Sequence, residues 1–287
     1  MTRTLLAIPN ISEGRDAGTV EAIGRAFDAR LLDVHADPDH HRSVFTLAGA
    51  PGQLAQAVRD GAAEALDRID VGRHQGIHPR VGAIDVAPIV YLDPPDRGAA
   101  CAEALVLGDL LGEQLELPVL LYGELAAGRS RAELRRGGPA ALSRRIEAGE
   151  LRPDFGPRRL HPSAGAVLVA ARPPLVAFNV ELAPPATLED ARTIAARIRD
   201  GGPEGLSSVR AIGLWLAARE VAQVSTNVED HRAVPLARVV EAIARHATPL
   251  RAELVGLAPR AAFDGLPADL PVANRRTVED ALAARGA

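Results

Sequence analysis

The sequence has 287 residues, 47% of them hydrophobic and 24% charged, which is typical of a globular protein with one large domain or two ordinary ones. All 33 basic residues are Arg, and a formal net charge of −4 argues against a general nucleic-acid-binding protein. The lone Cys101 cannot form an internal disulfide, and no apolar stretch reaches the length of a signal peptide or a membrane span. We therefore expect a soluble cytoplasmic protein with no nucleic-acid or membrane partner.

The first third of the chain predicts a strand, a helix, a hairpin, a second helix and a closing strand. Apolar runs and alternating patterns indicate the strands, and apolar residues at helical spacing indicate the helices. The expected strands are Leu5–Ile11, Leu31–His35, Ser43–Ala48 and Val81–Tyr91, and the expected helices are Thr19–Ala29 and Leu54–Ile69.

The same order of elements returns near the C-terminus, followed by a short helix over Thr277–Ala284. The expected strands are Leu175–Leu182, Val209–Leu216, Ala222–Thr226 and Arg251–Leu257, and the expected helices are Thr187–Ile198 and Leu236–Ala247. Two copies of β-α-β-β-α-β predict an α+β fold with two ferredoxin-like subdomains in tandem. We place the boundary at Pro173–Pro174, giving subdomains over residues 1–172 and 173–287.

Extra material lies between the copies and belongs to the first subdomain. We expect a helix over Leu105–Leu115 and strands over Pro118–Tyr122 and Ala166–Ala171. The segment from Arg129 to Arg159 holds nine Arg and four acidic residues, an excess of five positive charges. This segment is either a solvated surface or a lip that attracts an anionic ligand.

The loop His74–Gly82 has the strongest chemical signal. Two His stand four residues apart, but Gly76 and Pro79 disfavour a continuous helix that would pair them on a metal. A residue that precedes proline is held extended, so we expect His78 in a fixed conformation before the strand Val81–Tyr91. An imidazole there can take and return a proton near neutral pH. The alternative is a His that only satisfies loop carbonyls.

A second polar cluster, Asp33–Arg42, is rich in Asp and His. No spacing in it matches a zinc signature, and the glycine of an EF-hand loop is missing. Strand alternation would put Asp33 and His35 on one face. Substrate contacts, metal ligation and turn formation all stay open for this cluster.

Two further features have no role that the residues alone decide. The stiff loop Pro153–Gly165 lacks the Lys and the spacing of a P-loop. In the second subdomain, Asn179 and the segment Gln223–Asn227 put amides and hydroxyls into apolar strands. Buried polar groups need partners, which are either a neighbouring strand or a ligand.

Taken together, the motifs resemble the formiminotransferase domain of glutamate formiminotransferases, in the stand-alone bacterial-type form that lacks a cyclodeaminase domain. The resemblance runs in order through Ile8-Pro-Asn-Ile-Ser-Glu-Gly14, Leu32-Asp-Val-His35, Arg42-Ser-Val-Phe-Thr46, His74-x-Gly-x-His-Pro-Arg-x-Gly-Ala-x-Asp-Val86, Leu121-Tyr-Gly-Glu124, Pro153-Asp-Phe-Gly-Pro157, Ala177-Phe-Asn179, Gln223-Val-Ser-Thr-Asn227 and Glu253-Leu-Val-Gly-Leu257. It therefore covers nearly the whole chain from Ile8 to Leu257.

The resemblance implies a homodimeric enzyme that moves the formimino group of N-formimino-L-glutamate to tetrahydrofolate, its co-substrate, late in histidine degradation. His78 matches the catalytic His of the family, and no metal is expected. The stretch that matches the folate-binding segment comprises Gly156, Pro157, Arg158, Arg159, Leu160, His161, Pro162, Ser163, Ala164 and Gly165. Further candidates for substrate contact are Asp33, His35, Arg42, His74, Arg80 and Glu124.

One residue departs from the family pattern. Ile77 stands where family members carry Glu, directly before the catalytic-type His78. Loss of that carboxylate removes a charge that could raise the pKa of the imidazole or hold the amidine of the donor. Two alternatives therefore remain, namely transfer from a different formimino or formyl donor and a non-catalytic folate-binding protein.

Overall fold

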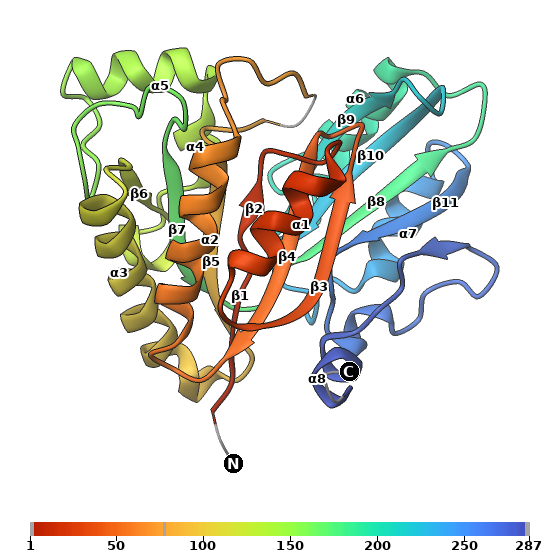
Figure 1. The fold of residues 1–287 in the computed structure, drawn as a ribbon. Coiled ribbons are helices and arrows are strands. Elements are labelled where there is room, and N and C mark those ends of the chain that lie inside the picture. The colour runs from red at the N-terminus through yellow and green to blue at the C-terminus, as the bar shows by residue number, and fades with distance from the viewer. Residues whose placement is uncertain (1–2, 77–78, 285–287) are drawn as a thin grey trace. The chain divides into compact units, whose positions relative to one another are not determined.

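The protein is α+β, as the sequence predicts, and forms two compact units (Figure 1). The computed structural model describes residues 3–76 and 79–284. The first unit is Met1–Pro173 and the second is Pro174–Ala287. Each unit has its own sheet and its own apolar core.

The first unit is built on a mixed seven-stranded sheet. Its strands are β1 (Leu5–Ala7), β2 (Asn10–Ile11), β3 (Arg30–Asp37), β4 (Arg42–Gly49), β5 (Ile84–Tyr91), β6 (Val119–Leu121) and β7 (Val167–Arg172). The β1 and β2 segments both lie between β4 and β5 and pair antiparallel with each, while β3 pairs with β4 alone. On the other side of β5, β7 and then β6 continue the sheet in parallel.

The predicted strand Leu5–Ile11 is interrupted in the structure. Pro9 has no N–H to give to a neighbouring strand, so pairing stops after β1 and resumes at β2 with a register shift against β5. The break places Asn10, the first residue of β2, next to the beginning of β4, with Val44 as its partner.

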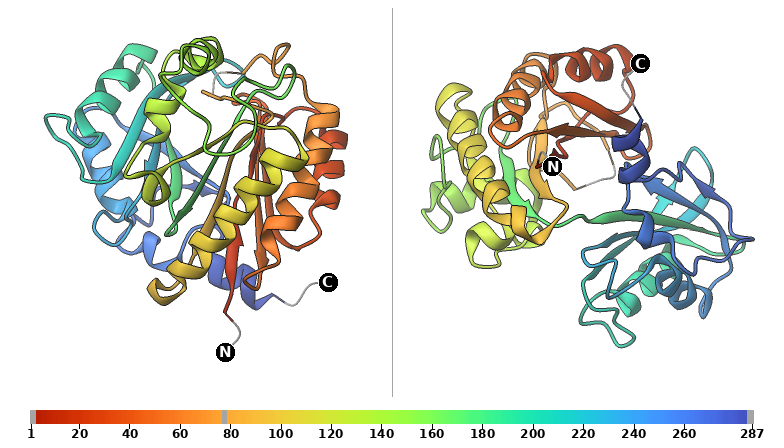
Figure 2. Two further views of the ribbon diagram at one scale, coloured as in Figure 1. Left: turned by 90° about the vertical axis from the view of Figure 1, so that its left-hand side faces the viewer. Right: turned by 90° about the horizontal axis from the view of Figure 1, so that it is seen from below.

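Three helices cover one face of this sheet. They are α1 (Ala17–Ala26), α2 (Leu54–Arg68) and α3 (Arg97–Gln114), and Figure 2 shows them side by side. Their apolar faces enclose a core that includes Ile23, Phe45 and Leu107. The buried carboxylate of Glu103 accepts hydrogen bonds from the backbone N–H groups of Gly52 (2.5 Å) and Ala55 (2.7 Å). It therefore acts as a cap for the N-terminus of α2.

The opposite face of β6 and β7 is covered by α4 (Arg131–Arg135) and α5 (Gly138–Glu147). Leu134 and Leu142 pack there with Leu120 and Leu168, forming a smaller core. Ser130 and Glu133 form a capping box that satisfies backbone donors at the start of α4.

The second unit is a five-stranded sheet with helices on one face. Its elements are β8 (Val176–Leu182), α6 (Leu188–Ile198), β9 (Val209–Leu216), β10 (Val221–Val228), α7 (Leu236–Ala244), β11 (Pro249–Val255), β12 (Val272–Ala273) and α8 (Val278–Ala283). The strand order is β12-β11-β8-β10-β9. The ferredoxin-like description of the two units stays a prediction.

Several predicted boundaries were wrong by three residues or more. The helix α3 begins eight residues before the predicted Leu105, because the Ala-rich stretch after Pro95 has little apolar periodicity but good helix propensity. The strand β5 begins at Ile84 rather than Val81, because the residues before it pair with a distant loop. Within residues 3–76 and 79–284, no helix is long and apolar enough to cross a membrane.

Candidate functional site

The segment from His74 to Gly82 lies in the first unit, beside the turn between β3 and β4. Ile77 and His78 lie outside the described residues. Arg80, which follows these two residues, donates from its guanidinium to the backbone oxygens of two residues that precede them, His74 (2.5 Å) and Gly76 (3.4 Å). Arg80 therefore holds the backbone of His74 and Gly76.

Two histidine rings stack at the start of this loop. The rings of His41 and His74 lie with centroids 4.1 Å apart and planes 21° apart, and Nε2 of His74 is 3.0 Å from the backbone oxygen of His41. Nδ1 of His41 lies 3.3 Å from a carboxylate oxygen of Glu13. Burial lowers the pKa of both imidazoles, so both favour the neutral form at physiological pH.

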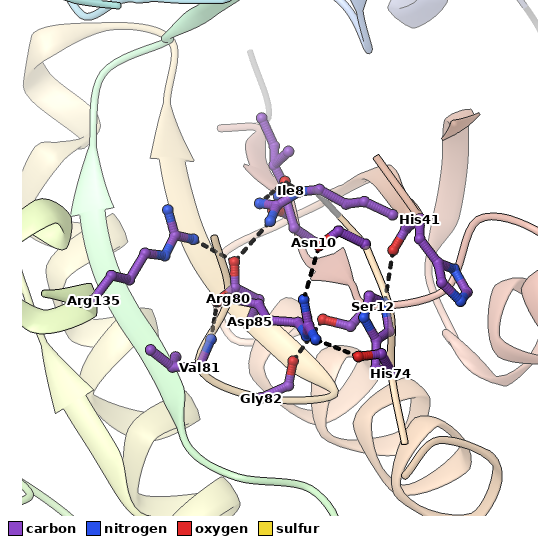
Figure 3. Close-up of polar contacts among 12 residues, drawn as sticks. Ile8, Asn10, Ser12, His41, His74, Arg80, Val81, Gly82, Asp85 and Arg135 are labelled. Atoms are coloured by element: carbon purple, nitrogen blue, oxygen red, sulfur yellow. Dashed lines mark hydrogen bonds and ion pairs between the residues drawn. The ribbon is translucent and has the colours of Figure 1, made fainter. Parts of the chain in front are cut away.

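The centre of the site is the fully buried carboxylate of Asp85, in β5. Its Oδ1 accepts the backbone N–H of Val81 at 2.8 Å. Its Oδ2 accepts from Nη1 of Arg42 at 2.7 Å and from Nη2 of Arg135. Figure 3 shows Arg135 pointing toward Asp85. Arg42 also donates from Nε and Nη2 to the side-chain oxygen of Asn10, at 3.0 and 2.5 Å.

The charges of this cluster act on one another strongly because the cluster is buried. Burial opposes ionisation of Asp85, but Arg135 and Arg42 more than offset it and lower the pKa of the carboxyl. Burial lowers the pKa of Arg42 to about 10, and Arg135 and Arg131 act in the same direction while Asp85 opposes them. Asp85 and Arg42 therefore both carry charge at neutral pH.

The stretch Gly156–Gly165 ends against this same region. Gly82 pairs with Gly165, the N–H of Ala83 donates to the oxygen of Ala164 at 2.9 Å, and the N–H of Ala166 donates to the oxygen of Val81 at 3.0 Å.

A hydrogen bond from the N–H of Val71 to the oxygen of Ser163, at 2.8 Å, adds a further tie. The approach is so close that a Cβ on Gly165, where φ is +72°, would stand 2.2 Å from the oxygen of Val81. Glycine is required there.

The Asp-rich and His-rich cluster Asp33–Arg42 divides into two parts. Asp37 closes the β3–β4 turn, because its carboxylate accepts the N–H of His40 at 2.9 Å and lies 2.7 Å from Nδ1 of the same residue. Asp33 is buried and His35 is partly buried on the face of β3 opposite the exposed Val34, as strand alternation predicts. Among the described residues, no group of three or more His, Cys, Asp or Glu side chains could hold a metal ion.

The sequence of each unit matches a known family. The family model described as the formiminotransferase domain, N-terminal subdomain, matches residues 4–172, and the formiminotransferase domain model matches residues 177–264. The chain belongs to the formiminotransferase domain family.

The relatives with curated names include two kinds of enzyme. The chain is 39% identical over 282 residues to the formimidoyltransferase-cyclodeaminase of Sus scrofa, with 90% of this chain and 51% of the relative covered. It is 35% identical over 272 residues to the glutamate formimidoyltransferase of Thermoplasma acidophilum, and the match covers 89% of this chain and 88% of the relative. It is 33% identical over 275 residues to the glutamate formimidoyltransferase of Streptococcus pyogenes, and that match covers 92% of this chain and 91% of the relative. The chain spans about half the length of the animal relatives that it matches.

The first formiminotransferase unit brings some of the predicted site residues together and separates another. Arg42, His74 and Arg80 take part in the connected set of contacts around Asp85 and the His74–Gly82 loop. Glu124 instead accepts from the Tyr91 hydroxyl at 3.0 Å and pairs with Arg97. Asp85 and Tyr91 stand near opposite ends of β5, so Glu124 is not part of that set.

Arg158 and Arg159 are exposed in the middle of the predicted folate stretch, whereas its end is held by backbone pairing. Nδ1 of His161 accepts the N–H of Ala164 at 3.1 Å, so this imidazole shapes the turn of the stretch.

Sequence reasoning did not select Asn10, Asp85 and Arg135 as site residues. Asn10 and Asp85 stand inside segments that resemble the family, and Asp85 is the one charged residue within the apolar strand β5. A charge in a buried strand requires a partner and was a usable signal. Nothing in the sequence distinguishes Arg135 from the other Arg residues around it.

The second formiminotransferase unit carries buried polar groups on the sheet face opposite α6 and α7. Register places Gln223 beside Glu181 and places Ser225 beside Asn179. Glu181 accepts from Arg219 at 2.6 Å and from Arg251 at 2.8 Å, so its partners are known. Gln223 is fully buried, and neither polar atom of its side chain has a hydrogen-bond partner in the described chain. The neighbouring strands therefore do not supply partners for the Gln223 amide.

Proposed function

We propose that this protein is an enzyme that transfers the formimino group from N-formimino-L-glutamate to tetrahydrofolate, a step of histidine degradation. Membership of the formiminotransferase domain family supports this reaction class. Two relatives named glutamate formimidoyltransferase align with the chain over about nine-tenths of their own lengths, which supports glutamate as the carrier of the group.

The backbone pairing between residues 81–83 and 164–166 carries the proposal. It ties the end of the proposed folate-binding stretch, 156–165, to the strand that follows the His74–Gly82 segment. A folate held by that stretch would therefore lie beside the segment that contains His78. Positioning of two reactants next to one acid/base group is the main requirement of a group transfer between nitrogens.

A single imidazole is sufficient for both proton transfers of the proposed reaction. N5 of tetrahydrofolate attacks the formimino carbon, and a new C–N bond forms while His78 removes the proton from N5. The C–N bond to the glutamate nitrogen then breaks, and His78 returns the proton to that nitrogen. The products are formimino-tetrahydrofolate and L-glutamate, with no redox change and no need for a metal.

Charge near the site fits acidic substrates. Both reactants end in carboxylates, and the segment Arg129–Arg159 has an excess of five positive charges. Arg matches the planar geometry of a carboxylate better than Lys does. We propose a homodimer in solution, which light scattering tests directly.

The test is turnover by the purified protein with tetrahydrofolate and N-formimino-L-glutamate, followed by the absorbance of the folate product. We expect turnover in the wild type and a loss of at least about 100-fold in His78→Ala, because general acid–base catalysis contributes about that much. His246→Ala is the matched control, since His246 lies in the second unit and pairs with Glu204 at 3.0 Å. Full activity in His78→Ala would overturn the assigned role.

Ile77 supports one alternative, transfer from another formimino or formyl donor. A wild type that binds tetrahydrofolate but does not turn over formiminoglutamate would favour this alternative, and a screen of donors would then identify the substrate. If Ile77→Glu gained activity with formiminoglutamate, the departure at this position would be shown to change donor choice. Folate binding without turnover of any donor would instead favour a non-catalytic folate-binding protein.

A further inference from the structure

The residues Val81–Ala83 lie three to five positions after His78 in the sequence and are tightly held. They pair through their backbone with residues 164–166, the segment that leads into β7. A Cβ on Gly82 would stand 2.0 Å from the backbone oxygen of Ala166, so only glycine allows the two segments to approach this closely. The backbone at residues 81–83 is therefore fixed relative to the end of the proposed folate-binding stretch.

Ser12 holds the same three residues from the β2 side, because β5 lies between β2 and β7 in the sheet. The Ser12 hydroxyl donates to the backbone oxygen of Gly82 at 2.7 Å, and this bond is buried (Figure 3). The Ser12 N–H donates to the backbone oxygen of Ala83 at 2.8 Å. The Ser12 residue is only 3% exposed. One small side chain therefore completes the hydrogen bonds on the side that the 164–166 segment does not reach.

The backbone on both sides of Ser12 is fixed by local structure. Ser12 directly follows β2, and Oε1 of Glu13 accepts the N–H groups of the next three residues, at 2.8, 2.7 and 3.0 Å. The chain is therefore closed into a turn between β2 and α1. Ser12 belongs to the segment Ile8–Gly14, which resembles the family but which the proposed reaction leaves without a role.

We propose that Ser12 is a positioning residue of the group transfer, and that it holds the backbone after His78 in register with the end of the proposed folate-binding stretch. This rests on the proposed function for the roles of His78 and of the stretch 156–165. Proton transfer requires the acid/base group within hydrogen-bond reach of the reacting nitrogen, and a misplacement of about 1 Å can cost about 100-fold in rate. Ser12 acts through the backbone and contacts neither reactant.

Few free torsions separate the anchored residues from His78. The ring of Pro79 fixes the φ angle of the residue that follows His78. The next residue, Arg80, is held by its hydrogen bonds to the backbone oxygens of His74 and Gly76. A displacement at Gly82 is therefore transmitted toward His78, because the intervening residues have little freedom to absorb it.

The first experiment compares steady-state kinetics of the wild type and Ser12→Ala. The variant removes the hydroxyl bond to Gly82 and keeps the backbone bond to Ala83. We expect kcat to fall by about 10- to 100-fold. We expect KM for tetrahydrofolate and for the donor each to stay within about threefold, because the pairing of residues 81–83 with 164–166 remains.

The matched control is Thr226→Val in the second unit. It removes a buried hydroxyl that donates to the backbone oxygen of Phe178 at 2.5 Å, so both variants lose one buried bond from a hydroxyl to a carbonyl. The midpoints of urea unfolding should fall by similar amounts, but only Ser12→Ala should lose kcat. An equal loss of kcat in both variants would overturn the inference, because the loss would then follow from stability alone.

Hydrogen exchange followed by mass spectrometry tests whether the effect passes through the backbone after His78. Peptides that cover residues 79–91 should exchange faster in Ser12→Ala than in the wild type, and at the wild-type rate in Thr226→Val. Unchanged exchange in Ser12→Ala would overturn the inference.

The kinetic outcomes also separate this inference from the proposed function. A folded Ser12→Ala variant with kcat within twofold of the wild type would overturn the inference while the proposed function stood. If the wild type used a different donor and Ser12→Ala lowered kcat with that donor, the inference would stand and the proposed donor would fall. A wild type that turned over no donor would overturn both.

Discussion

Replacing Asp85 by Asn removes one negative charge from a fully buried site and changes almost no volume. The Asn side chain keeps an acceptor for the N–H of Val81, so the change isolates the charge. Arg42 and Arg135 then face each other without the carboxylate that pairs with both. Removing one partner of a buried ion pair costs about 3–5 kcal/mol. That is a large part of the about 5–15 kcal/mol that stabilises a typical protein.

The assay is urea unfolding followed by circular dichroism at neutral pH. We expect Asp85→Asn to lower the free energy of unfolding by about 3–5 kcal/mol and the exposed Asp67→Asn to stay within about 0.5 kcal/mol. The double variant with Arg135→Gln should lose less than the sum of the single losses, because it removes the excess charge together with the carboxylate. An Asp85→Asn protein within 1 kcal/mol of the wild type would refute the argument that this ion pair holds the site together.

Three further predictions concern other positions. Burial opposes ionisation of Asp37, but hydrogen bonds and charge in its turn lower its pKa to about 2, so its contribution to stability is complete above about pH 4 and is lost as the pH falls to about 2. Acid titration of unfolding should therefore show about 2 kcal/mol less pH dependence in Asp37→Asn. Gly165→Ala should lower the free energy of unfolding by about 2 kcal/mol or more, because the new Cβ meets the oxygen of Val81. The control is Gly149→Ala, which has a φ of +75° but open space around the new Cβ and should lose only about 1 kcal/mol. Equal losses in the two variants would contradict the steric argument. Gln223→Met should leave the free energy of unfolding in urea unchanged or raise it by up to about 1–3 kcal/mol, because it removes a buried amide that has no partner among the described residues. A clear loss of stability would show that the amide has a partner.

The periodicity of the sequence was sufficient for most of the fold. The helix Leu54–Arg68 ends within one residue of its prediction because Ala and Leu recur at helical spacing up to Ile69. The short helix predicted over Thr277–Ala284 is observed over Val278–Ala283, and the structure shows that Thr277 caps it. Where local signals were weak, as in the Ala-rich start of α3, prediction gave a helix that was too short.

The residues of the site could be predicted from the sequence only in part. The sequence pointed to Arg42, His74 and Arg80 because His, Arg, Gly and Pro crowd into short segments that resemble the family. It could not pair Arg42 with Arg135, since only the packing of α4 over the sheet brings residues 93 positions apart to one carboxylate.

The sequence by itself determined the family and the α+β class, because these depend on local patterns and on motifs in order. Tertiary structure alone decided which charges meet at Asp85 and that Gly82 lies against Gly165, because these depend on strand register and helix packing between distant segments. Energies of buried charge depend on those distant neighbours and not on the residue types that flank them in the chain.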